Sequence, residues 1–571
     1  MRLKNYQKNL NRRLLIFYFF CLAFCLLIIY KLVEVHVINH EFYDKKFKQQ
    51  TIGRIEIPSF RGRILDRNGV ILAYSLPSYS IAIRPTKIDI SKTQEIYHLL
   101  KEKGVPIKQN AKEFDNLIKS LKEENIPFYF IARKFTHDMH DLKDINSIQG
   151  IEVIKEPSGK RHYNFECLTD IIGMVDIDDR GLEGVELYLD KSNSQITGKY
   201  GYYELIFDAL GNPNYNRVLK YVPPVEGKDV KLSIDVFLQQ SIDILAKQKL
   251  EYHQASEVTI VVSNKNGEIL ACVSVDREEK DFVIGGINKL YEPGSVFKVF
   301  TVVAALESKL SPYQKFYSGP SITVDGWVIY NADDGLYTSG YETIEDILTY
   351  SFNVGTVSLM QAIGRENFIK FLEKLGFYEY SGIEHPSDVK PLVGDLTNEP
   401  NIRLATISFG QGIAITPLHI LRLMTIIANG GYKVPLTLIH GKNRYGEKVL
   451  SDFTVKEARK YLRSVVVRGT GKKAEIKGYF CAGKTGTAQV PSPNGGYLAG
   501  KYIASFVGFF PYFDPQYIIV VSVKEPVGMY YGGQVAAPIF REVASIIISR
   551  YSIKPYINYQ EEGKNERSDY R

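Results

Sequence analysis

The hydrophobic pattern of this chain begins with an unbroken apolar run from Leu14 to Tyr30. At a rise of about 1.5 Å per residue, a helix of this length just crosses the hydrocarbon core of a bilayer, and Lys31 can extend its ammonium group to the far surface. The residues before the run are basic and include no acid, which favours a cytoplasmic position for that end. We predict a cytoplasmic basic stub over residues 1–13 and a transmembrane anchor over residues 14–33. The alternative, a cleaved signal peptide, is disfavoured because its apolar core is usually shorter and no Ala-x-Ala-like site follows the run.

Three further regions follow the anchor. Residues from Glu34 to about Gln50 are charged and aromatic, which predicts a helical stalk. From Thr51 to about Lys220 we expect short strands and helices with few long apolar runs, little more than a solvated spacer, including a segment rich in lysine and glutamate near residues 91–145. Pro223–Gly227 is typical of a linker. The predicted boundaries are a stalk and elongated mixed α/β pedestal over 34–222, a second large domain over 223–552, and a charged, disordered tail over 553–571.

The second large domain opens at Lys231–Asp235. Apolar, β-prone segments predict strands at 258–262 and 268–271, followed by a buried helical block and then strands at 503–510 and 517–523. Strands at both ends of a helical insert predict a single antiparallel sheet flanked by helices, an α+β fold.

Inside the helical block, the tetrad Ser295-Val296-Phe297-Lys298 places a hydroxyl and an amine three residues apart. On a helix this spacing puts both side chains on one face, within hydrogen-bonding reach. The preceding Pro293-Gly294 predicts that Ser295 lies in the first helical turn, and the apolar residues that follow predict a buried helix. Burial lowers the pKa of a lysine, so the pattern predicts that Lys298 acts as a base toward Ser295 in serine acyl transfer.

A second Ser-x-x-Lys tetrad, Ser387–Lys390, lies between Pro386 and Pro391. A proline directly after the lysine disfavours helical backbone at that lysine. We therefore predict an exposed loop there, with no catalytic role.

Two more short motifs follow the first tetrad. Ser351-Phe352-Asn353 lies between a helix expected from Thr343 and another expected from Thr356 onward, and it offers a hydroxyl and an amide that can bridge a proton path and grip a peptide group. The signal is weak alone, since Ser492-Pro493-Asn494 matches by chance. Lys484-Thr485-Gly486-Thr487 lies among small and β-prone residues that predict a strand, where the glycine allows another backbone to lie close. Its lysine and two threonine hydroxyls suit a carboxylate.

The order Ser-x-x-Lys, Ser-x-Asn, Lys-Thr-Gly is the signature of penicillin-binding proteins and serine β-lactamases. The sequence resembles most closely the class B, monofunctional high-molecular-weight penicillin-binding proteins, and among them the division-specific, septal subgroup. One departure is Val296, where the family often has threonine, which we expect to alter packing rather than chemistry. The likeness runs over roughly residues 50–550 and includes Arg61–Gly69, Leu72-Ala73, Arg161–Tyr163, Gly181–Glu186, Gly410–Gly412, Thr416–Leu418, Gly469–Gly471, Phe506–Phe509 and Gly532–Pro538.

The resemblance implies a transpeptidase domain of the penicillin-binding and serine β-lactamase-like fold, held on its pedestal outside the bacterial cytoplasmic (inner) membrane. The implied activity is a peptidoglycan D,D-transpeptidase of septal cell-wall synthesis, which cross-links D-Ala-D-Ala stem peptides and is acylated by β-lactams. It implies no cofactor. A polytopic membrane glycosyltransferase and other division proteins are the implied partners, because no glycosyltransferase-sized domain fits the N-terminal region.

Site roles follow from the same resemblance. Ser295 is expected to be the nucleophile, Lys298 its base, Ser351 a proton relay, and Asn353 the group that holds a substrate amide and the lysine. Lys484, Thr485, Gly486 and Thr487 are expected to bind the terminal carboxylate, and the backbone N–H groups of Ser295 and Thr487 to form the oxyanion hole.

Alternatives remain. The segment Tyr291–Ser295 resembles the septal subgroup, because elongation enzymes commonly have a second proline at the position of Glu292. This distinction rests on one residue, so an elongation transpeptidase is the nearest alternative. A β-lactam hydrolase shares the three motifs but needs neither pedestal nor anchor. A β-lactam sensor would need further membrane spans, and a catalytically silent scaffold would not need the intact motif set.

Composition narrows the function classes further. The formal charge of +7 is mild and much of it lies in the basic stub, so it does not indicate nucleic acid. Of five cysteines, two lie in the apolar run and three are far apart, which predicts no disulfide framework and makes Cys481 a small core residue. Ten histidines without an HExxH motif or close pairing predict no catalytic metal.

Overall fold

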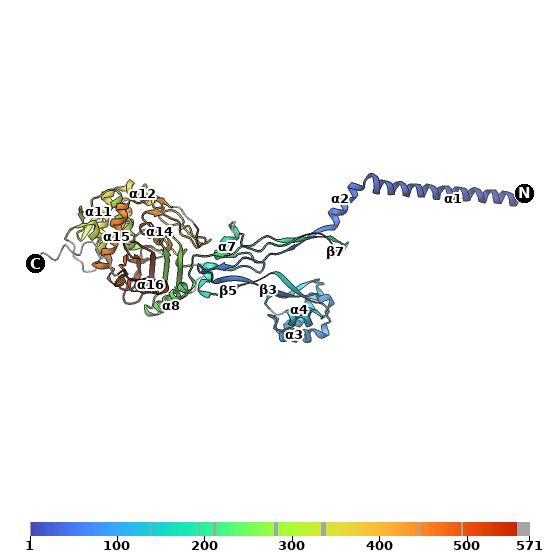
Figure 1. Cartoon of the computed structure of the whole chain (residues 1–571), viewed down its shortest axis with the longest axis horizontal. Helices are drawn as coiled ribbons and strands as arrows, with labels where there is room; N and C mark the ends of the chain where they lie inside the picture. The colour runs from blue at the N-terminus through green and yellow to red at the C-terminus, as the bar shows by residue number, and fades with distance from the viewer. Residues whose placement is uncertain are drawn as a thin grey trace. The chain divides into compact units, whose positions relative to one another are not determined.

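The computed structural model describes residues 2–136, 139–192, 195–208, 213–278, 284–332, 339–442, 446–492 and 495–556 (Figure 1). They form two compact units. The first contains Met1–Phe60, Glu156–Ser158 and Thr197–Gly227, and the second contains Arg61–Lys155, Gly159–Ile196 and Lys228–Arg571. This division does not separate the predicted pedestal from the large domain after it, so the boundaries at 222 and 552 stay predictions. Most of the predicted tail, residues 557–571, lies outside the described residues.

The first unit joins a long helix to a small sheet. Helix α1 (Arg2–Val33) includes the basic stub as well as the apolar run, and a π-helical turn (Glu34–Ile38) and α2 (His40–Thr51) follow it, so the residues predicted as a stalk are helical. Strands β1 (Ile52–Ile57), β6 (Gly201–Phe207) and β7 (Pro213–Val222) form an antiparallel sheet in the order β1-β6-β7. Among the described residues, one helical stretch, Asn11–Ile38, is long and apolar enough to cross a membrane, which fits a single-pass anchor.

The second unit begins with a sheet of order β4-β3-β2-β8, with β5 also paired to β3. Its strands are β2 (Ile64–Leu65), β3 (Ile71–Ile83), β4 (Tyr129–Phe135), β5 (Ile151–Tyr163) and β8 (Val230–Lys231), and its helices are α3 (Thr93–Glu102), α4 (Ala111–Glu123), α5 (Met139–Asn146), α6 (Thr169–Ile172) and α7 (Gly184–Lys191). The expectation of short strands in this region was wrong, because β3 and β5 are each 13 residues long.

The expectation of a solvated spacer was also wrong for residues 91–145. Ile96 and Leu100 of α3 and Phe114 and Ile118 of α4 are buried in a separate hydrophobic core. The apolar residues recur four positions apart, so each helix has one apolar face among its charged residues even though the sequence contains no long apolar run.

The large domain that opens at Lys231–Asp235 is built on a five-stranded sheet of order β10-β9-β19-β18-β17, with every pair of neighbouring strands antiparallel. The strands are β9 (Glu257–Asn264), β10 (Ile269–Asp276), β17 (Ala482–Pro491), β18 (Tyr497–Phe510) and β19 (Tyr517–Lys524). They confirm the predicted strands and the predicted antiparallel sheet assembled from both ends of a helical insert.

Helices cover both faces of this sheet. Along β19, Ile519, Val521 and Val523 enter one core with α8 (Val236–Tyr252) and α16 (Ala536–Arg550), while Ile518 and Val520 enter the opposite core, because successive strand side chains alternate. The opposite core holds α9 (Lys298–Glu307), α11 (Asn353–Ile363), α14 (Pro417–Ala428) and α15 (Asp452–Val467), and Figure 1 shows α8 and α16 grouped apart from α11, α14 and α15. The α+β fold is confirmed.

Smaller elements are β11 (Lys315–Tyr317), β12 (Ser321–Val324), β13 (Trp327–Tyr330), β14 (Tyr341–Thr343), α10 (Ile344–Tyr350), α12 (Arg365–Lys374), α13 (Asn401–Ser408), β15 (Tyr432–Lys433) and β16 (Glu447–Lys448).

Three N-terminal sequence segments that carry the family resemblance meet in one buried ion cluster. Glu186 is fully buried and accepts hydrogen bonds from Arg61 Nε at 2.7 Å and from Arg161 Nε at 2.8 Å. Arg61 also pairs with Asp190 at 2.6 Å, and Arg161 donates to the Gly62 carbonyl at 2.8 Å. Because two buried guanidinium groups share the Glu186 carboxylate, the cluster fixes how these segments pack together.

We expect Glu186→Gln to lower the free energy of unfolding of the full chain by about 3 kcal/mol, because it leaves two buried cations short of one negative charge. The shift of the urea midpoint measures this loss. Asp229→Asn is the control, since Asp229 pairs with Arg63 while both side chains are well exposed, 37% and 54%, and an exposed pair contributes about 1 kcal/mol or less. Equal shifts for the two variants would contradict a structural role for the buried cluster.

Candidate active site

The first motif lies where an irregular turn becomes a buried helix. Gly294–Phe297 form a 3-10 turn that contains Ser295, and α9 begins at Lys298. Every residue of α9 from Lys298 to Leu306 is buried, as the sequence predicted, whereas Ser295 is only half-buried. Gly294 takes a φ of +52°, and its N–H donates to the Gly410 carbonyl at 3.0 Å, so the turn before the serine is held against a distant loop.

The second motif lies at a junction of two helices. Ser351 ends α10 in the left-handed conformation, with φ of +65°, which is uncommon for a residue other than glycine. Asn353 begins α11, three residues earlier than the start expected at Thr356. The side chain of Asn331 accepts a hydrogen bond from the Val354 N–H at 3.0 Å, and this cap comes from a segment that local sequence does not reveal.

The Ser351 hydroxyl joins the first and third motifs. Lys298 Nζ donates to Ser351 Oγ at 3.1 Å and to the Ser351 carbonyl at 2.5 Å. Lys484 Nζ donates to the same Ser351 Oγ at 2.9 Å. Both lysine side chains are fully buried. The structure therefore brings Lys298, Ser351 and Lys484 together around a single oxygen atom.

The third motif lies on β17, one of the two edge strands of the sheet. Gly486 is needed there, since a Cβ atom at this position would lie 2.8 Å from Val296 Cγ2 and 3.1 Å from the Pro293 carbonyl oxygen. The close approach of another backbone that the sequence predicted at Gly486 is confirmed. A Cβ atom at Gly294 would likewise lie 3.1 Å from the Thr487 carbonyl oxygen, so the Ser295 turn lies directly against β17.

The remaining predicted site residues have described partners of their own. Asn353 Nδ2 donates to the Tyr330 carbonyl at 2.9 Å. The hydroxyls of Thr485 and Thr470 lie 2.7 Å apart, and Thr487 Oγ1 accepts the Gly532 N–H at 3.0 Å. Sequence reasoning assigned no role to these partners. Thr470 and Gly532 lie in Gly-Thr-Gly and Gly-Gly segments, which suggest a close backbone approach, but the sequence around Tyr330 carries no signal.

This arrangement can support acyl transfer to a serine. A hydroxyl has two acceptor lone pairs and one O–H donor. Because two lysines donate to Ser351 Oγ, its own proton is available to another group. The cation of Lys484 and the hydroxyls carried by β17 are the groups that a carboxylate binds.

The sequence contains several other candidate features besides these three motifs. Ser387–Lys390 is loop without helical structure, as predicted. Pro493 and Asn494 of the chance Ser-x-Asn match lie outside the described residues. Cys481 is fully buried, and burial raises the pKa of its thiol to about 12, which fits a small core residue. Within the described ranges, no group of three or more histidine, cysteine, aspartate or glutamate side chains is placed to hold a metal ion.

Comparison with known proteins agrees with this geometry. The family model for the penicillin binding protein transpeptidase domain matches residues 258–545, and that for the penicillin-binding protein dimerisation domain matches residues 56–232. Stage V sporulation protein D of Bacillus subtilis is 29% identical, over 98% of this chain and 88% of that protein. The peptidoglycan D,D-transpeptidase FtsI of Buchnera aphidicola is 30% identical, over 87% of this chain and 88% of that protein.

A solved structure shares the fold. The crystal structure of a peptidoglycan synthetase from Bifidobacterium adolescentis matches with a TM-score of 0.69 at 21% identity, over 88% of this chain and 97% of that one. The sequence motifs, the antiparallel sheet and both family models lead to the same assignment. The chain belongs to the class B penicillin-binding proteins, which join a dimerisation domain to a transpeptidase domain.

Proposed function

We propose that this protein is a peptidoglycan D,D-transpeptidase that works through an acyl-enzyme on Ser295. The observation that carries the proposal is the joining of Lys298, Ser351 and Lys484 at one hydroxyl, beside the turn that holds Ser295. Each comes from a different motif of the transpeptidase signature. Relatives whose printed names include a peptidoglycan D,D-transpeptidase support the same substrate for this chain.

Acylation begins at the Ser295 hydroxyl. Its oxygen attacks the carbonyl carbon of the penultimate D-Ala of a stem peptide, and the amine of Lys298 takes the hydroxyl proton. The bond to the terminal D-Ala nitrogen then breaks, and Ser351 passes a proton to that nitrogen, so the terminal D-Ala leaves as an amine. Asn353 holds a substrate amide during these steps.

Lys298 has to be neutral when it accepts the proton. Lys298 and Lys484 donate to the same Ser351 oxygen inside the protein, and two ammonium ions so close repel each other, which favours the neutral amine on one of them. A neutral amine has two N–H groups, enough for the two bonds to Ser351, and one lone pair that can receive the proton of Ser295.

The third motif binds the ends of the reacting group. Lys484, Thr485 and Thr487 bind the terminal carboxylate of the stem peptide, with Gly486 keeping the strand close to the turn. The backbone N–H groups of Ser295 and Thr487 stabilise the oxyanion, and the contact between Gly294 and Thr487 supports this pairing. One such donor contributes roughly 3–4 kcal/mol to the transition state in a serine enzyme.

An amine from a neighbouring stem peptide completes the reaction. It attacks the acyl carbonyl, the bond to Ser295 breaks, and the serine regains its proton as the new peptide bond forms. A β-lactam acylates the same serine, but its leaving nitrogen stays attached to the acyl group through the opened ring. The adduct therefore persists.

The cellular role that we propose is septal. Glu292 in the segment Tyr291–Ser295 supports it, as does a relative named FtsI, while another relative is named for sporulation. The elongation enzyme is the alternative. We further propose that α1 anchors the chain in the cytoplasmic membrane with residues 1–13 inside, and that a polytopic membrane glycosyltransferase and other division proteins are partners.

We expect a fluorescent penicillin to label the purified full chain covalently and Ser295→Ala to abolish the label. Ser387→Ala is the matched control, because Ser387 belongs to the other Ser-x-x-Lys tetrad and lies in a loop. Loss of label in the Ser387→Ala control would contradict the assignment of Ser295. A folded wild type that takes no label but turns over the β-lactam would also contradict it and would indicate a hydrolase.

We expect Lys298→Met, which keeps the length of the side chain and removes the amine, to slow penicillin acylation by about 100-fold or more, the range that a general base contributes. Time courses of labelling measure the rate. Lys390→Met in the other tetrad should acylate at the wild-type rate, since Lys390 is exposed. A Lys298→Met rate within a few-fold of wild type would remove the proposed base.

A further inference from the structure

The segment that leads into the nucleophile is bound along its length to the loop Gly410–Ile415. Gly294 N–H donates to the Gly410 carbonyl at 3.0 Å. Tyr291 and Ile415 exchange two backbone hydrogen bonds, each 3.0 Å long. These bonds place the loop beside the Ser295 turn but do not reach β17, which carries the other half of the candidate site.

The side chain of Glu292 connects these parts. Glu292 is 8% exposed, and its carboxylate accepts the Gly412 N–H at 2.8 Å on one oxygen and the Tyr497 hydroxyl at 3.0 Å on the other. Tyr497 is the first residue of β18 and pairs with Pro491 at the end of β17. One carboxylate therefore links the segment before the nucleophile, the loop beside it and the β17–β18 hairpin.

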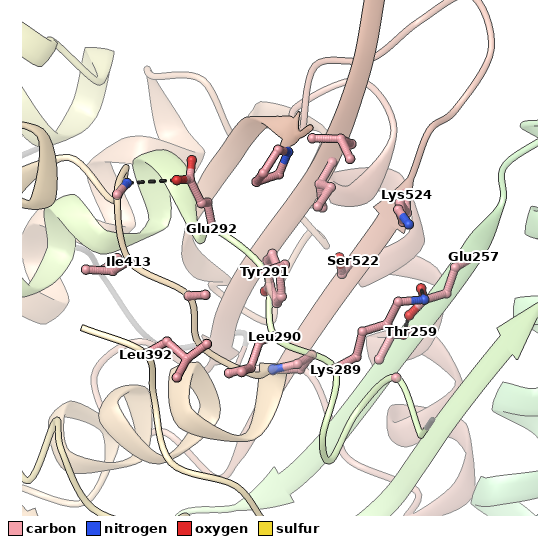
Figure 2. Close-up of a pocket in the computed structure, with 17 residues that line it drawn as sticks. Glu257, Thr259, Lys289, Leu290, Tyr291, Glu292, Leu392, Ile413, Ser522 and Lys524 are labelled. Atoms are coloured by element: carbon pink, nitrogen blue, oxygen red, sulfur yellow. Dashed lines mark hydrogen bonds and ion pairs between the residues drawn. The ribbon is translucent and has the colours of Figure 1, made fainter. Parts of the chain in front are cut away.

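Packing around this carboxylate is incomplete. A cavity of about 440 Å³ lies beside it, lined by residues that include Tyr291, Glu292, Gly412, Val490 and Pro491. Figure 2 shows Tyr291 near the middle of the pocket and, as a dashed line at Glu292, the bond to Gly412. The Tyr291 hydroxyl is buried there without a described hydrogen-bond partner. Because the cavity leaves the end of β17 without full packing on this side, hydrogen bonds have more influence on its position than in a filled core.

The two lysines of the cavity wall each have acidic neighbours. Lys289 forms ion pairs with Glu257 and with Asp276, and Lys524 lies 3.7 Å from Glu525. Among the described residues, the cavity wall thus presents no lysine without an acidic neighbour to a charged ligand. This favours a role for Glu292 within the protein over a role in binding a charged molecule.

We propose that Glu292 is a positioning residue: by binding Gly412 and Tyr497 at once, it sets the separation between the Ser295 turn and strand β17. The inference rests on the proposed function, because this separation decides whether the N–H groups of Ser295 and Thr487 can bind one oxyanion together. Glu292 acts in this proposal through the positions of the Ser295 turn and strand β17. A misplacement of about 1 Å in such a site lowers a rate by about 100-fold.

The energetics of Glu292 agree with a role beyond stability. Burial raises the pKa of its carboxyl, and the bonds from Gly412 and Tyr497 act in the opposite direction. A buried carboxylate costs free energy that hydrogen bonds only partly offset, so an apolar side chain beside the cavity would stabilise the fold at least as well. The connection that Glu292 makes is therefore a better account of this buried carboxylate than a contribution to stability.

The test compares penicillin acylation of full-length variants, with the rate constant of acylation separated from the dissociation constant by varying the penicillin concentration. We expect Glu292→Leu, which removes both bonds, to lower the rate constant by about 30-fold, and Tyr497→Phe, which removes one, by about fivefold, each with a nearly unchanged dissociation constant. Glu292→Gln retains an acceptor for Gly412 and a polar group for Tyr497, so its rate constant should stay within about threefold of wild type.

The double variant Glu292→Leu with Tyr497→Phe should have the same rate constant as Glu292→Leu alone, because both changes break the same connection.

Glu384→Leu is the control for lost stability. Glu384 is 1% exposed, accepts the Leu438 N–H at 2.8 Å, and is not one of the residues of the candidate active site. This variant should melt at a lower temperature and still acylate at the wild-type rate constant. The positioning role is overturned if Glu292→Leu acylates like wild type, or if Glu384→Leu loses as much rate at an equal loss of stability.

Tyr497→Phe keeps the test decisive if Glu292→Leu does not fold, because Tyr497 is 41% exposed and its ring is retained. An unchanged rate constant in Tyr497→Phe would then overturn the proposal. A folded wild-type chain that penicillin does not acylate would overturn the proposed function and this role with it, whereas a labelled wild type with unaffected variants overturns this role alone.

Discussion

Two buried lysines that donate to the same hydroxyl, that of Ser351, set the main constraint on this molecule. Burying an ammonium group is costly unless hydrogen bonds compensate, and two ammonium ions at one oxygen repel each other, which is why one of the two amines is neutral in the proposed mechanism. The arrangement requires the start of α9, the end of α10 and strand β17 to meet at one point. Ser351 takes a left-handed backbone conformation there, so the residue that both lysines contact also has a strained backbone.

The sheet and its helices make this convergence possible. Strands β9 and β10 precede the helical block, and β17, β18 and β19 follow it in the same sheet. The third motif, on β17, therefore lies beside the first motif in space although the two are far apart in sequence. Glycines at 294 and 486 remove the Cβ atoms that would keep the turn and the strand apart. Positions with no catalytic atom are therefore as necessary to the site as the polar residues.

Local patterns predicted much of this from sequence. The apolar anchor helix, the five strands of the large sheet and the buried helix after Ser295 follow from apolar runs and turn residues, and the three motifs in order identified the candidate site. The contacts from Thr470, Gly532 and Tyr330 were not predicted, because the glycines around the first two suggest only a close backbone approach and the sequence does not indicate which distant group each residue meets. The start of α11 was misplaced for the same reason. The core near residues 91–145 was missed because its apolar residues lie four apart among charges, a pattern that a search for long apolar runs overlooks.

Strand β17 lies at the end of the sheet order, with a strand neighbour, β18, on one side. An edge strand presents backbone N–H and C=O groups along its outer side, and an extended peptide can align with them as an added strand. Recognition of this kind reads the shape of a main chain rather than its side chains. Under the binding mode that we propose, in which Lys484 meets the terminal carboxylate, the protein can accept stem peptides of varied composition provided that their backbone is extended and ends in a carboxylate.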